Sequence, residues 1–266
     1  MPEFSSAKTA AQLDDLADRA WPALETRSVG SWVVRWGGGV TKRANSVLPR
    51  GEVDNLDDAI TEVEEVYRDR GLAPTFQLSP ASRPEGLARR LDARGYVEDS
   101  HTLIQVADVG RVAASASVLP VTAVDGTGTV TVSVDGAPDD DWMALWWSVD
   151  GRGGDAEREF ARRILSGAPA RYASIRDRHG VVATARLAFV DDWAGLYALA
   201  TRPDARRRGL ARHLIAALAR EAGDRGVDRM WLQVLAGNAS AIALYRSLGF
   251  ETVSGYSYWT APDFTA

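Results

Sequence analysis

Cysteine is absent from this sequence, and histidine occurs only three times. Without cysteine the chain has no disulfide bond, no thiolate nucleophile and no cysteine-ligated metal. His101, His179 and His213 are scattered along the chain and lack the close spacing of metal ligands. We therefore expect neither a metal site nor covalent catalysis through a thiol.

Lysine and long apolar runs are scarce as well. Lys8 and Lys42 are the only lysines, so arginine supplies almost all of the positive charge. Together with abundant alanine, glycine and valine, this usage is typical of a GC-rich bacterial genome. No apolar run approaches the roughly 20 residues that span a bilayer, and the acidic, amphipathic N-terminus lacks the apolar core of a secretory signal. These absences predict a cytoplasmic bacterial protein without a membrane partner.

The residues that are present have the proportions of an ordinary globular protein. Hydrophobic residues make up 45% and charged residues 25% of the 266 residues, which predicts a buried core. The length suits two smaller domains better than one compact domain. The net charge of −5 argues against nucleic acid as a partner, because proteins that bind polyanions carry a positive surface.

Hydrophobic periodicity predicts both helices and strands, and therefore an α/β fold. Apolar residues recur at helical spacing in seven segments, at about 6–21, 55–70, 85–94, 140–149, 155–165, 207–224 and 239–248. Alternating or continuous apolar stretches predict strands, among them "VVATARLAFV", "GLYALATR" and "MWLQVLA". Residues 108–128 are rich in small side chains and lack helical periodicity, which predicts a domain boundary there.

An internal repeat supports two similar halves. Each half runs helix, Asp-Arg-Gly, strand, helix, Gly-aromatic, strand. The first copy reads "DRGLAPTFQL" and then "GLARRLDARGYVEDSHTLIQV", and the second reads "DRGVDRMWLQV" and then "ALYRSLGFETVSGYSYW". We expect domains at 1–107 and 128–266, joined by a linker at 108–127.

Two conspicuous patches have structural explanations. Gly37–Gly39 joins two predicted strands and opens no helix, which favours a tight turn over a phosphate loop. Trp142 and Trp146 recur with Leu145 at helical spacing, which favours core packing over the wall of a substrate pocket.

The stretch "LATRPDARRRGLARHLI", residues 199–215, carries the strongest chemical signal. A strand ends at Thr-Arg-Pro, and Arg206 to Ala211 then open a helix whose first N–H groups have no intrahelical partner. These donors and the positive end of the helix dipole form an anion site, and Gly209 and Ala211 let a phosphate approach the backbone. The motif R-x-x-G-x-A is weak alone. After one more strand, however, the chain reads "NASAIALYRSLGF", residues 238–250.

The two blocks together resemble the acetyl-CoA signature of the GCN5-related N-acetyltransferase (GNAT) superfamily over residues 128–260. Arg206, Gly209 and Ala211 match the [Q/R]-x-x-G-x-[G/A] motif, and Asn238 and Tyr245 match the second block. Thr201 departs from the family's valine. The resemblance implies an α/β fold of two GNAT-like domains, each a mixed, splayed sheet flanked by helices. Only the C-terminal domain would carry the cofactor motif.

The resemblance also implies roles for individual residues. Backbone groups of Leu199 and Thr201 would bind the pantetheine arm of acetyl-CoA, and Asn238 would face the cofactor together with Tyr245. The pyrophosphate would be held at Arg206, Arg207, Arg208, Gly209, Leu210, Ala211 and Arg212. Tyr245 would protonate the leaving thiolate, a role that a phenol with a pKa near 10 suits. The alternative for Tyr245 is a half-buried aromatic residue of an amphipathic helix.

The general base is not assigned by the motif, because the strand "GLYALAT" carries no carboxylate. Asp191 and Asp192 are weak candidates at the preceding strand end, and His179 is another; an Asp or His in a turn is more often solvated and structural. The sequence does not identify the acceptor, which is either a small-molecule amine or a protein amine. It also does not distinguish a monomer from a homodimer.

The first half lacks both cofactor blocks. Before its helix at 55–70 the turn reads "LPRGEVDNLDDA", which is acidic and would repel a pyrophosphate. We therefore expect a degenerate GNAT-like domain whose segment 21–49 contributes to the acceptor pocket. The leading hypothesis is an N-acetyltransferase that passes an acetyl group from acetyl-CoA directly to an amine. The alternative is a non-catalytic acyl-CoA-binding or interaction module, and nucleic-acid binding is third.

Overall fold

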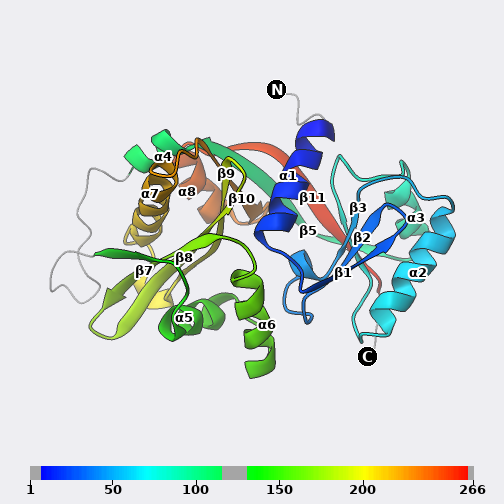
Figure 1. The fold of residues 1–266 in the computed structure, drawn as a ribbon, viewed down its shortest axis with the longest axis horizontal. Coiled ribbons are helices and arrows are strands. Elements are labelled where there is room, and N and C mark those ends of the chain that lie inside the picture. The colour runs from blue at the N-terminus through cyan, green and yellow to red at the C-terminus, as the bar shows by residue number, and fades with distance from the viewer. Residues whose placement is uncertain (1–6, 116–130, 263–266) are drawn as a thin grey trace.

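A single mixed sheet of eleven strands, with helices on both faces, runs through the computed structural model (Figure 1). The structure describes residues 7–115 and 131–262. This arrangement confirms the predicted α/β class and the mixed sheet flanked by helices. None of the helices in these two ranges is long and apolar enough to cross a bilayer.

The helices and strands alternate irregularly along the chain. The α-helices are α1 (Ala7–Ala20), α2 (Leu56–Arg68), α3 (Leu87–Ala93), α4 (Val109–Ala114), α5 (Asp140–Asp150), α6 (Asp155–Leu165), α7 (Leu210–Gly223) and α8 (Ala239–Ser247). Two short 3₁₀ helices are η1 (Lys42–Ala44) and η2 (Pro203–Ala205). The strands are β1 (Glu25–Val29), β2 (Trp32–Trp36), β3 (Val47–Pro49), β4 (Thr75–Leu78), β5 (Val97–Asp108), β6 (Val132–Asp135), β7 (Ala170–Asp177), β8 (Gly180–Val190), β9 (Trp193–Thr201), β10 (Arg229–Leu235) and β11 (Glu251–Thr260).

The strand order interleaves the two halves of the sequence. It runs β1-β2-β3-β4-β11-β5-β10-β9-β8-β7-β6, so β11 lies between β4 and β5, and β5 lies between β11 and β10. The last strand of each half is therefore hydrogen-bonded within the other half. Neighbouring strands are antiparallel except for two pairs, β3 with β4 and β9 with β10. The division into domains at 1–107 and 128–266 stays a prediction.

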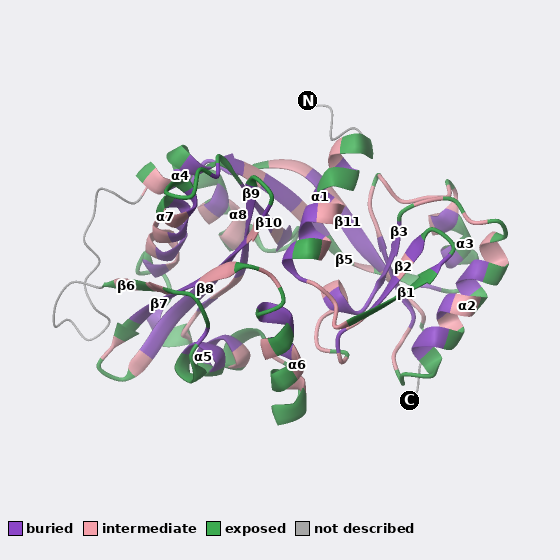
Figure 2. Ribbon diagram, viewed as in Figure 1, coloured by how far each residue is buried: buried purple, intermediate pink, exposed green. Residues whose placement is uncertain are grey.

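Helices cover both faces of the C-terminal strands. On one face, α4, α7 and α8 bury an apolar cluster that includes Leu214, Leu232 and Phe250. On the other face, α1, α5 and α6 bury a second cluster that is rich in aromatic residues, among them Trp21 and Trp146. The predicted core role of Trp142 and Trp146 is confirmed, since each is 2% exposed. Figure 2 shows the buried residues concentrated along the central strands.

The N-terminal strands are covered by different helices on their two faces. Val34 and Phe76 pack with Ile60 of α2, whereas Arg35, next to Val34, turns to the opposite face. There its guanidinium donates to Asp18 of α1 at 3.1 Å. Helix α1 also contacts β8, β9 and β11, so it lies across the junction of the two halves (Figure 1).

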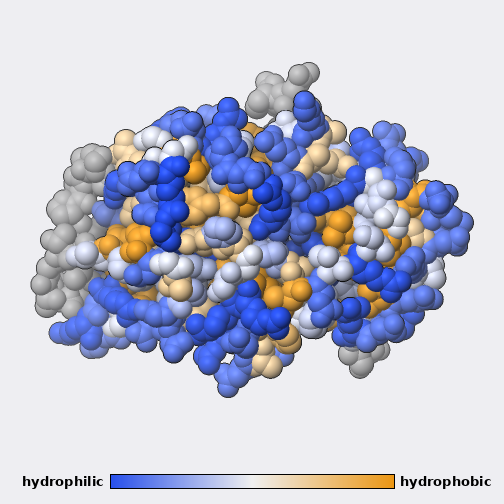
Figure 3. Space-filling model, viewed as in Figure 1, coloured by the Kyte–Doolittle hydropathy of each residue, from blue (hydrophilic) through white to orange (hydrophobic). Residues whose placement is uncertain are grey.

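The face drawn in Figure 3 is mostly hydrophilic with small apolar patches.

The predicted repeat of element order is confirmed. In both halves, a glycine ends each of the two helices of the repeat. Gly71 and Gly226 follow α2 and α7, Gly95 and Gly249 follow α3 and α8, and all have positive φ, between 66° and 97°. After each glycine, the next N–H donates back over the helix end at 3.0 Å, as Val227 does to Ala222. A left-handed residue after the helix end is glycine's characteristic position, because no Cβ clashes there. The turn chemistry thus ends all four helices in the same way.

Two expectations about helices need correction. Residues 109–114 form α4, although this segment shows no helical periodicity; Asp108 caps it by accepting from the N–H of Arg111 at 2.9 Å. The helix expected from Arg207 begins at Leu210 instead, because Arg207 and Gly209 have φ of 62° and 80°. Residues 116–127 of the expected linker lie outside the described residues.

Candidate active site

An opening in the middle of the sheet is the framework of the site. Strands β9 and β10 pair from Trp193 with Arg229 to Leu196 with Leu232, and no pair follows. Both strands nevertheless continue, β9 to Thr201 and β10 to Leu235, each still paired on its outer side. Two backbone edges therefore face each other across a gap. An extended ligand can enter there and hydrogen-bond to a strand edge as another strand would.

A bulge turns β9 away from β10 at this point. Ala198 has φ of 51°, and the pairing register with β8 shifts between Thr184 and Arg186. Thr184 Oγ1 donates to the Ala198 carbonyl at 3.4 Å. A bulge bends its strand and increases the local twist, which separates the strand ends. Leu199 and Thr201, the expected pantetheine contacts, lie on β9 just beyond the bulge.

The turn between β9 and α7 has the geometry of an anion site. Gly209 is the N-cap of α7 and has no capping side chain, so the first N–H groups of the helix, at Leu210 and Ala211, lack a side-chain cap. The preceding Arg207 is also left-handed, and Arg206 to Gly209 are exposed. Free N–H groups at the positive end of a helix dipole attract an anion.

The arginines of this turn have different surroundings. Arg206 Nε donates to the Thr201 carbonyl at 3.3 Å, which ties the end of β9 to the turn. Arg212 Nη2 donates to Ser247 Oγ at 2.6 Å and links α7 to the end of α8. Arg202, which was not among the expected contacts, is paired with Asp177 at 2.9 Å and with Asp204 at 2.6 Å. The positive charge around the helix start therefore comes from Arg206, Arg207, Arg208 and Arg212.

Helix α8 begins at Asn238 and carries Tyr245 near its end. Asn238 is the N-cap, and its Oδ1 accepts from the Ala241 N–H at 3.2 Å. Tyr245 is 8% exposed and packs edge-on against Phe250, with ring centroids 6.0 Å apart. It shares an apolar cluster with Leu199 of β9 and Val234 of β10. Tyr245 thus lies in the apolar cluster that includes residues of the diverging strands, whereas Asn238 lies at the exposed helix start.

The hydroxyl of Tyr245 has no hydrogen-bond partner among the described residues. Burial raises its pKa to about 12. The phenol is consequently protonated at neutral pH, and no described residue accepts its proton in a hydrogen bond. Both properties suit a group that donates a proton.

The three candidates for a base do not meet at the opening. Asp191 and Asp192 form the turn before β9, roughly 20 Å from Leu199 at the rise of a strand. Asp191 is exposed and accepts from Arg19 at 2.6 and 2.7 Å, which lowers the pKa of its carboxyl below the usual range. His179 is exposed in the β7–β8 turn, where its Nε2 accepts from Arg178 at 2.9 Å.

Sequence reasoning missed several residues of the strands around the opening. Gln233 is the first residue of β10 beyond the last pair with β9, and both its side-chain Oε1 and Nε2 are buried without partners. Arg186 of β8 is fully buried against aromatic rings, and burial lowers the pKa of its guanidinium. Leu235, which ends β10, is 53% exposed. One signal was available, because Gln233 is the single polar residue in "MWLQVL".

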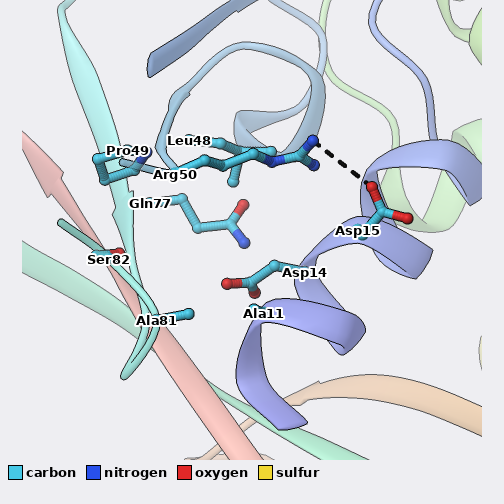
Figure 4. Close-up of a pocket in the computed structure, with 9 residues that line it drawn as sticks. All are labelled: Ala11, Asp14, Asp15, Leu48, Pro49, Arg50, Gln77, Ala81 and Ser82. Atoms are coloured by element: carbon cyan, nitrogen blue, oxygen red, sulfur yellow. Dashed lines mark ion pairs between the residues drawn. The ribbon is translucent and has the colours of Figure 1, made fainter. Parts of the chain in front are cut away.

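The N-terminal half has a counterpart of the opening, and α1 covers it. Strands β3 and β4 pair in parallel only at Val47 with Phe76. A cavity of about 250 Å³ lies beside their ends, and Figure 4 shows Asp14 and Asp15 of α1 facing Arg50 and Gln77 across it. The Arg50–Asp15 ion pair, at 3.6 Å, spans this cavity.

The titratable group of this cavity is Asp14. Burial raises the pKa of its carboxyl to about 6. One carboxylate oxygen accepts from Ser79 Oγ at 2.5 Å, and the other has no hydrogen-bond partner within residues 7–115 and 131–262.

The mixed sheet, the diverging parallel strands and the uncapped helix start define the class of the chain, an acyltransferase of the GNAT superfamily. The model of the family described as "Probable histone acetyltransferase Rv0428c C-terminal" matches residues 10–259, and the chain belongs to that family. The match spans both halves of the sheet, so the interleaved architecture lies within one family unit.

Relatives and solved structures agree with this class. An uncharacterized N-acetyltransferase of Bacillus subtilis (strain 168), YobR, is 27% identical over 248 residues, which cover 93% of this chain and 96% of that protein. A [ribosomal protein bS18]-alanine N-acetyltransferase of Salmonella typhimurium is 53% identical over 60 residues, 23% of this chain and 40% of that protein. The fold is similar to a GCN5-related N-acetyltransferase from Kribbella flavida, with a TM-score of 0.66 at 18% identity over 96% of each chain. It is also similar to a tandem GNAT protein from the clavulanic acid biosynthesis pathway, with a TM-score of 0.60 at 16% identity over 78% of this chain and 70% of that one.

Proposed function

We propose that the chain is a cytoplasmic N-acetyltransferase that transfers an acetyl group from acetyl-CoA to an amine by direct attack. The observation that carries the proposal is the opening between β9 and β10, which ends at the uncapped start of α7. In the proposed complex, edge groups of Leu199 and Thr201 bind the pantetheine arm. The pyrophosphate lies at the N–H groups of residues 209–212, surrounded by the arginines of the turn.

The proposed chemistry needs one proton to leave the amine and one to reach the thiolate. The acceptor nitrogen attacks the thioester carbonyl, and the C–S bond breaks as the C–N bond forms. The Tyr245 hydroxyl supplies the proton to the departing sulfur. The amine gives its proton to solvent, because the candidate carboxylates Asp191 and Asp192 lie far along β9.

We also propose that only the C-terminal half binds the cofactor. The N-cap of α2, Asn55, accepts from the N–H groups of Asp57 and Asp58 at 2.9 and 3.3 Å. Its own side chain therefore fills the place that a phosphate would take at α7, and two aspartates add negative charge. Helix α1 covers the gap beside β3 and β4 as well.

The test measures acetyl-CoA binding by calorimetry and thiol release with a panel of amines. We expect one acetyl-CoA per chain and thiol release that depends on an amine. Binding without turnover on any amine would favour the alternative, a non-catalytic acyl-CoA-binding module. Absence of binding would contradict both, and two bound molecules per chain would contradict the assignment to one half.

A further inference from the structure

Unpartnered buried polar atoms gather on one face of the sheet, beneath α1, η1 and α5. In the described ranges, nine buried side-chain nitrogen and oxygen atoms lack a hydrogen-bond partner. Seven of them belong to five residues of this face, Arg43, Trp146, Arg186, Gln233 and Ser254. Most proteins satisfy nearly all such atoms, so a concentration on one face indicates a site for a polar ligand.

The pairing register places Gln233 and Ser254 on this face. Both residues stand directly opposite Ile104 of β5, one on each side of it. Directly opposed residues point to the same face of a sheet. Ile104 packs in the aromatic-rich cluster under α1, so Gln233 and Ser254 point there too.

Two arginines on this face lie against aromatic rings and have no carboxylate partner in the described ranges. The guanidinium of Arg43 lies 5.4 Å from the ring centroids of both Trp21 and Tyr197, and that of Arg186 lies 5.8 Å from the same two rings. Arg186 is 0% exposed; its Nη1 donates to the Ala20 carbonyl at 3.0 Å, and its Nε and Nη2 have no hydrogen-bond partner among the described residues. Neither arginine has a carboxylate within ion-pair distance among the described residues.

Arg35 is a buried arginine of this chain whose guanidinium has both an ion-pair partner and hydrogen-bond acceptors. Arg35 is 1% exposed, pairs with Asp18 at 3.1 Å, and donates to Ser46 and Gln77 at 2.7 to 3.0 Å. A buried charge without such partners is strongly unfavourable, so Arg43 and Arg186 favour an anion from outside the chain beside them.

The site adjoins the proposed reaction centre. Tyr197, under both guanidinium groups, directly precedes the bulge at Ala198. Gln233 stands across the opening on β10. A thioester that enters between β9 and β10 from the α7 turn therefore reaches this face next to the two arginines.

The loop that carries Arg43 is held in place from within. Asn45 Oδ1 accepts from the N–H groups of Gly37 and Gly39 at 2.8 and 2.9 Å. Asn45 Nδ2 donates to the Thr41 carbonyl at 2.7 Å. Arg43 is partly exposed, whereas Arg186 is 0% exposed. Arg43 is consequently the arginine that an incoming ligand contacts.

We propose that the acceptor is an amine that also carries a carboxylate, and that Arg43 binds this carboxylate while Arg186 adds charge from beneath. The proposal rests on the proposed acetyltransferase function. A planar guanidinium suits a carboxylate because it donates two parallel hydrogen bonds. The N-terminal half, through η1, thereby determines the acceptor class of a site whose cofactor lies in the C-terminal half.

The test compares matched acceptors with and without the carboxylate, such as β-alanine with β-alaninamide and leucine with leucinamide. We expect kcat/KM, measured by thiol release from acetyl-CoA, to be at least tenfold higher for the carboxylates. Arg43→Gln removes this preference through KM, and Arg43→Lys keeps part of it. Arg70→Gln is the matched control, because the Arg70 guanidinium also stacks on a tryptophan, 6.0 Å from the Trp36 ring, away from the opening.

Two further measurements keep the proposal separate from the proposed function. The first applies if acetyl-CoA binds and no amine is acetylated. Calorimetry then measures binding of N-acetyl-β-alanine and of its amide. The anion site is supported when only the carboxylate binds and Arg43→Gln abolishes that binding. Equal binding of acid and amide overturns it. A preference for succinyl-CoA over acetyl-CoA with neutral amines also overturns it, because the carboxylate then belongs to the acyl donor.

Discussion

Tyr245 combines burial, an unpartnered hydroxyl and a pKa raised to about 12, and each property has a separate consequence. Tyr245→Phe is expected to lower kcat by about 10²- to 10⁴-fold, the usual contribution of a general acid. The acetyl-CoA Kd and the Tm change little, because the hydroxyl makes no hydrogen bond to any residue that the structure describes. Steady-state kinetics and a thermal melt check both; an unchanged kcat would leave Tyr245 a packing residue.

The pH dependence of the reaction follows from the same residue. A tyrosine with a pKa near 12 stays protonated throughout the usual range, so it does not limit the rate at alkaline pH. A primary alkylamine loses its proton near pH 10. We therefore expect kcat/KM for such an acceptor to rise about tenfold per pH unit from pH 6 to 9. A decline between pH 8 and 9, with the protein still folded, would contradict this assignment.

Asp14 makes a prediction about stability instead of catalysis. Its carboxyl has a pKa raised to about 6 in the folded chain, so folding favours the protonated form. Its contribution to stability is therefore complete below about pH 4 and is lost as pH rises through 6. Asp14→Asn is expected to stabilise the protein by about 1 to 3 kcal/mol at pH 7.5 and by little at pH 4.

Thermal melts across that range measure the difference between Asp14→Asn and the wild type. Asp15→Asn is the matched control, because the Asp15 side chain on the same helix is 49% exposed. Equal stabilisation by Asp14→Asn at both pH values would show that Asp14 is ionised throughout.

At the scale of the helix, the start of α7 depends on Gly209. Its φ of 80° strains any other residue by about 1 kcal/mol, and in the proposed complex the absence of a Cβ lets a phosphate approach the backbone. Gly209→Ala is expected to weaken acetyl-CoA binding at least tenfold in calorimetry. Gly226→Ala, beyond the other end of α7, is the control, because its φ is 75° and no atom lies within 4 Å of an added Cβ. Equal effects on Kd would mean that the backbone strain alone is responsible.

Most elements of the fold could be predicted, because their signals are local. The helix-ending glycines, the acidic cap of α5 at Asp139 and the uncapped turn at Gly209 are all readable from a few adjacent residues. Helix α4 was missed because it is short and made of small residues. Arg43, Arg186 and Gln233 were missed because their importance depends on neighbours more than a hundred residues away, such as Tyr197 next to Arg43.

At the scale of the whole molecule, the exchange of β5 and β11 could not be predicted. Both strands have ordinary strand patterns, and nothing in such a pattern identifies the neighbour across a sheet. The internal repeat even favours two separate halves. In the structure, β5 pairs with β10 over residues 102–108, and β11 pairs with β4 over residues 257–260.

This exchange predicts that the halves depend on each other for folding. Residues 128–266 alone lack β5, which leaves the edges of β10 and β11 unpaired. We expect this fragment to aggregate, or to fold only when residues 1–115 are supplied in trans. Size-exclusion chromatography and circular dichroism of the fragments check this. A monomeric, folded 128–266 fragment that binds acetyl-CoA with wild-type affinity would support independent domains.

The position of β11 in the sheet also delays completion of the N-terminal half during translation. β5 ends at residue 108 and β11 begins at 251, so 142 residues are translated between β5 and the strand that pairs with both β4 and β5. At about 5 to 20 residues per second, that interval lasts roughly 7 to 30 seconds. During it, the N-terminal half emerges from the ribosome with an incomplete sheet and open strand edges. Its folding is therefore completed by the last strand made, and chaperones that shield strand edges have their main opportunity within that interval.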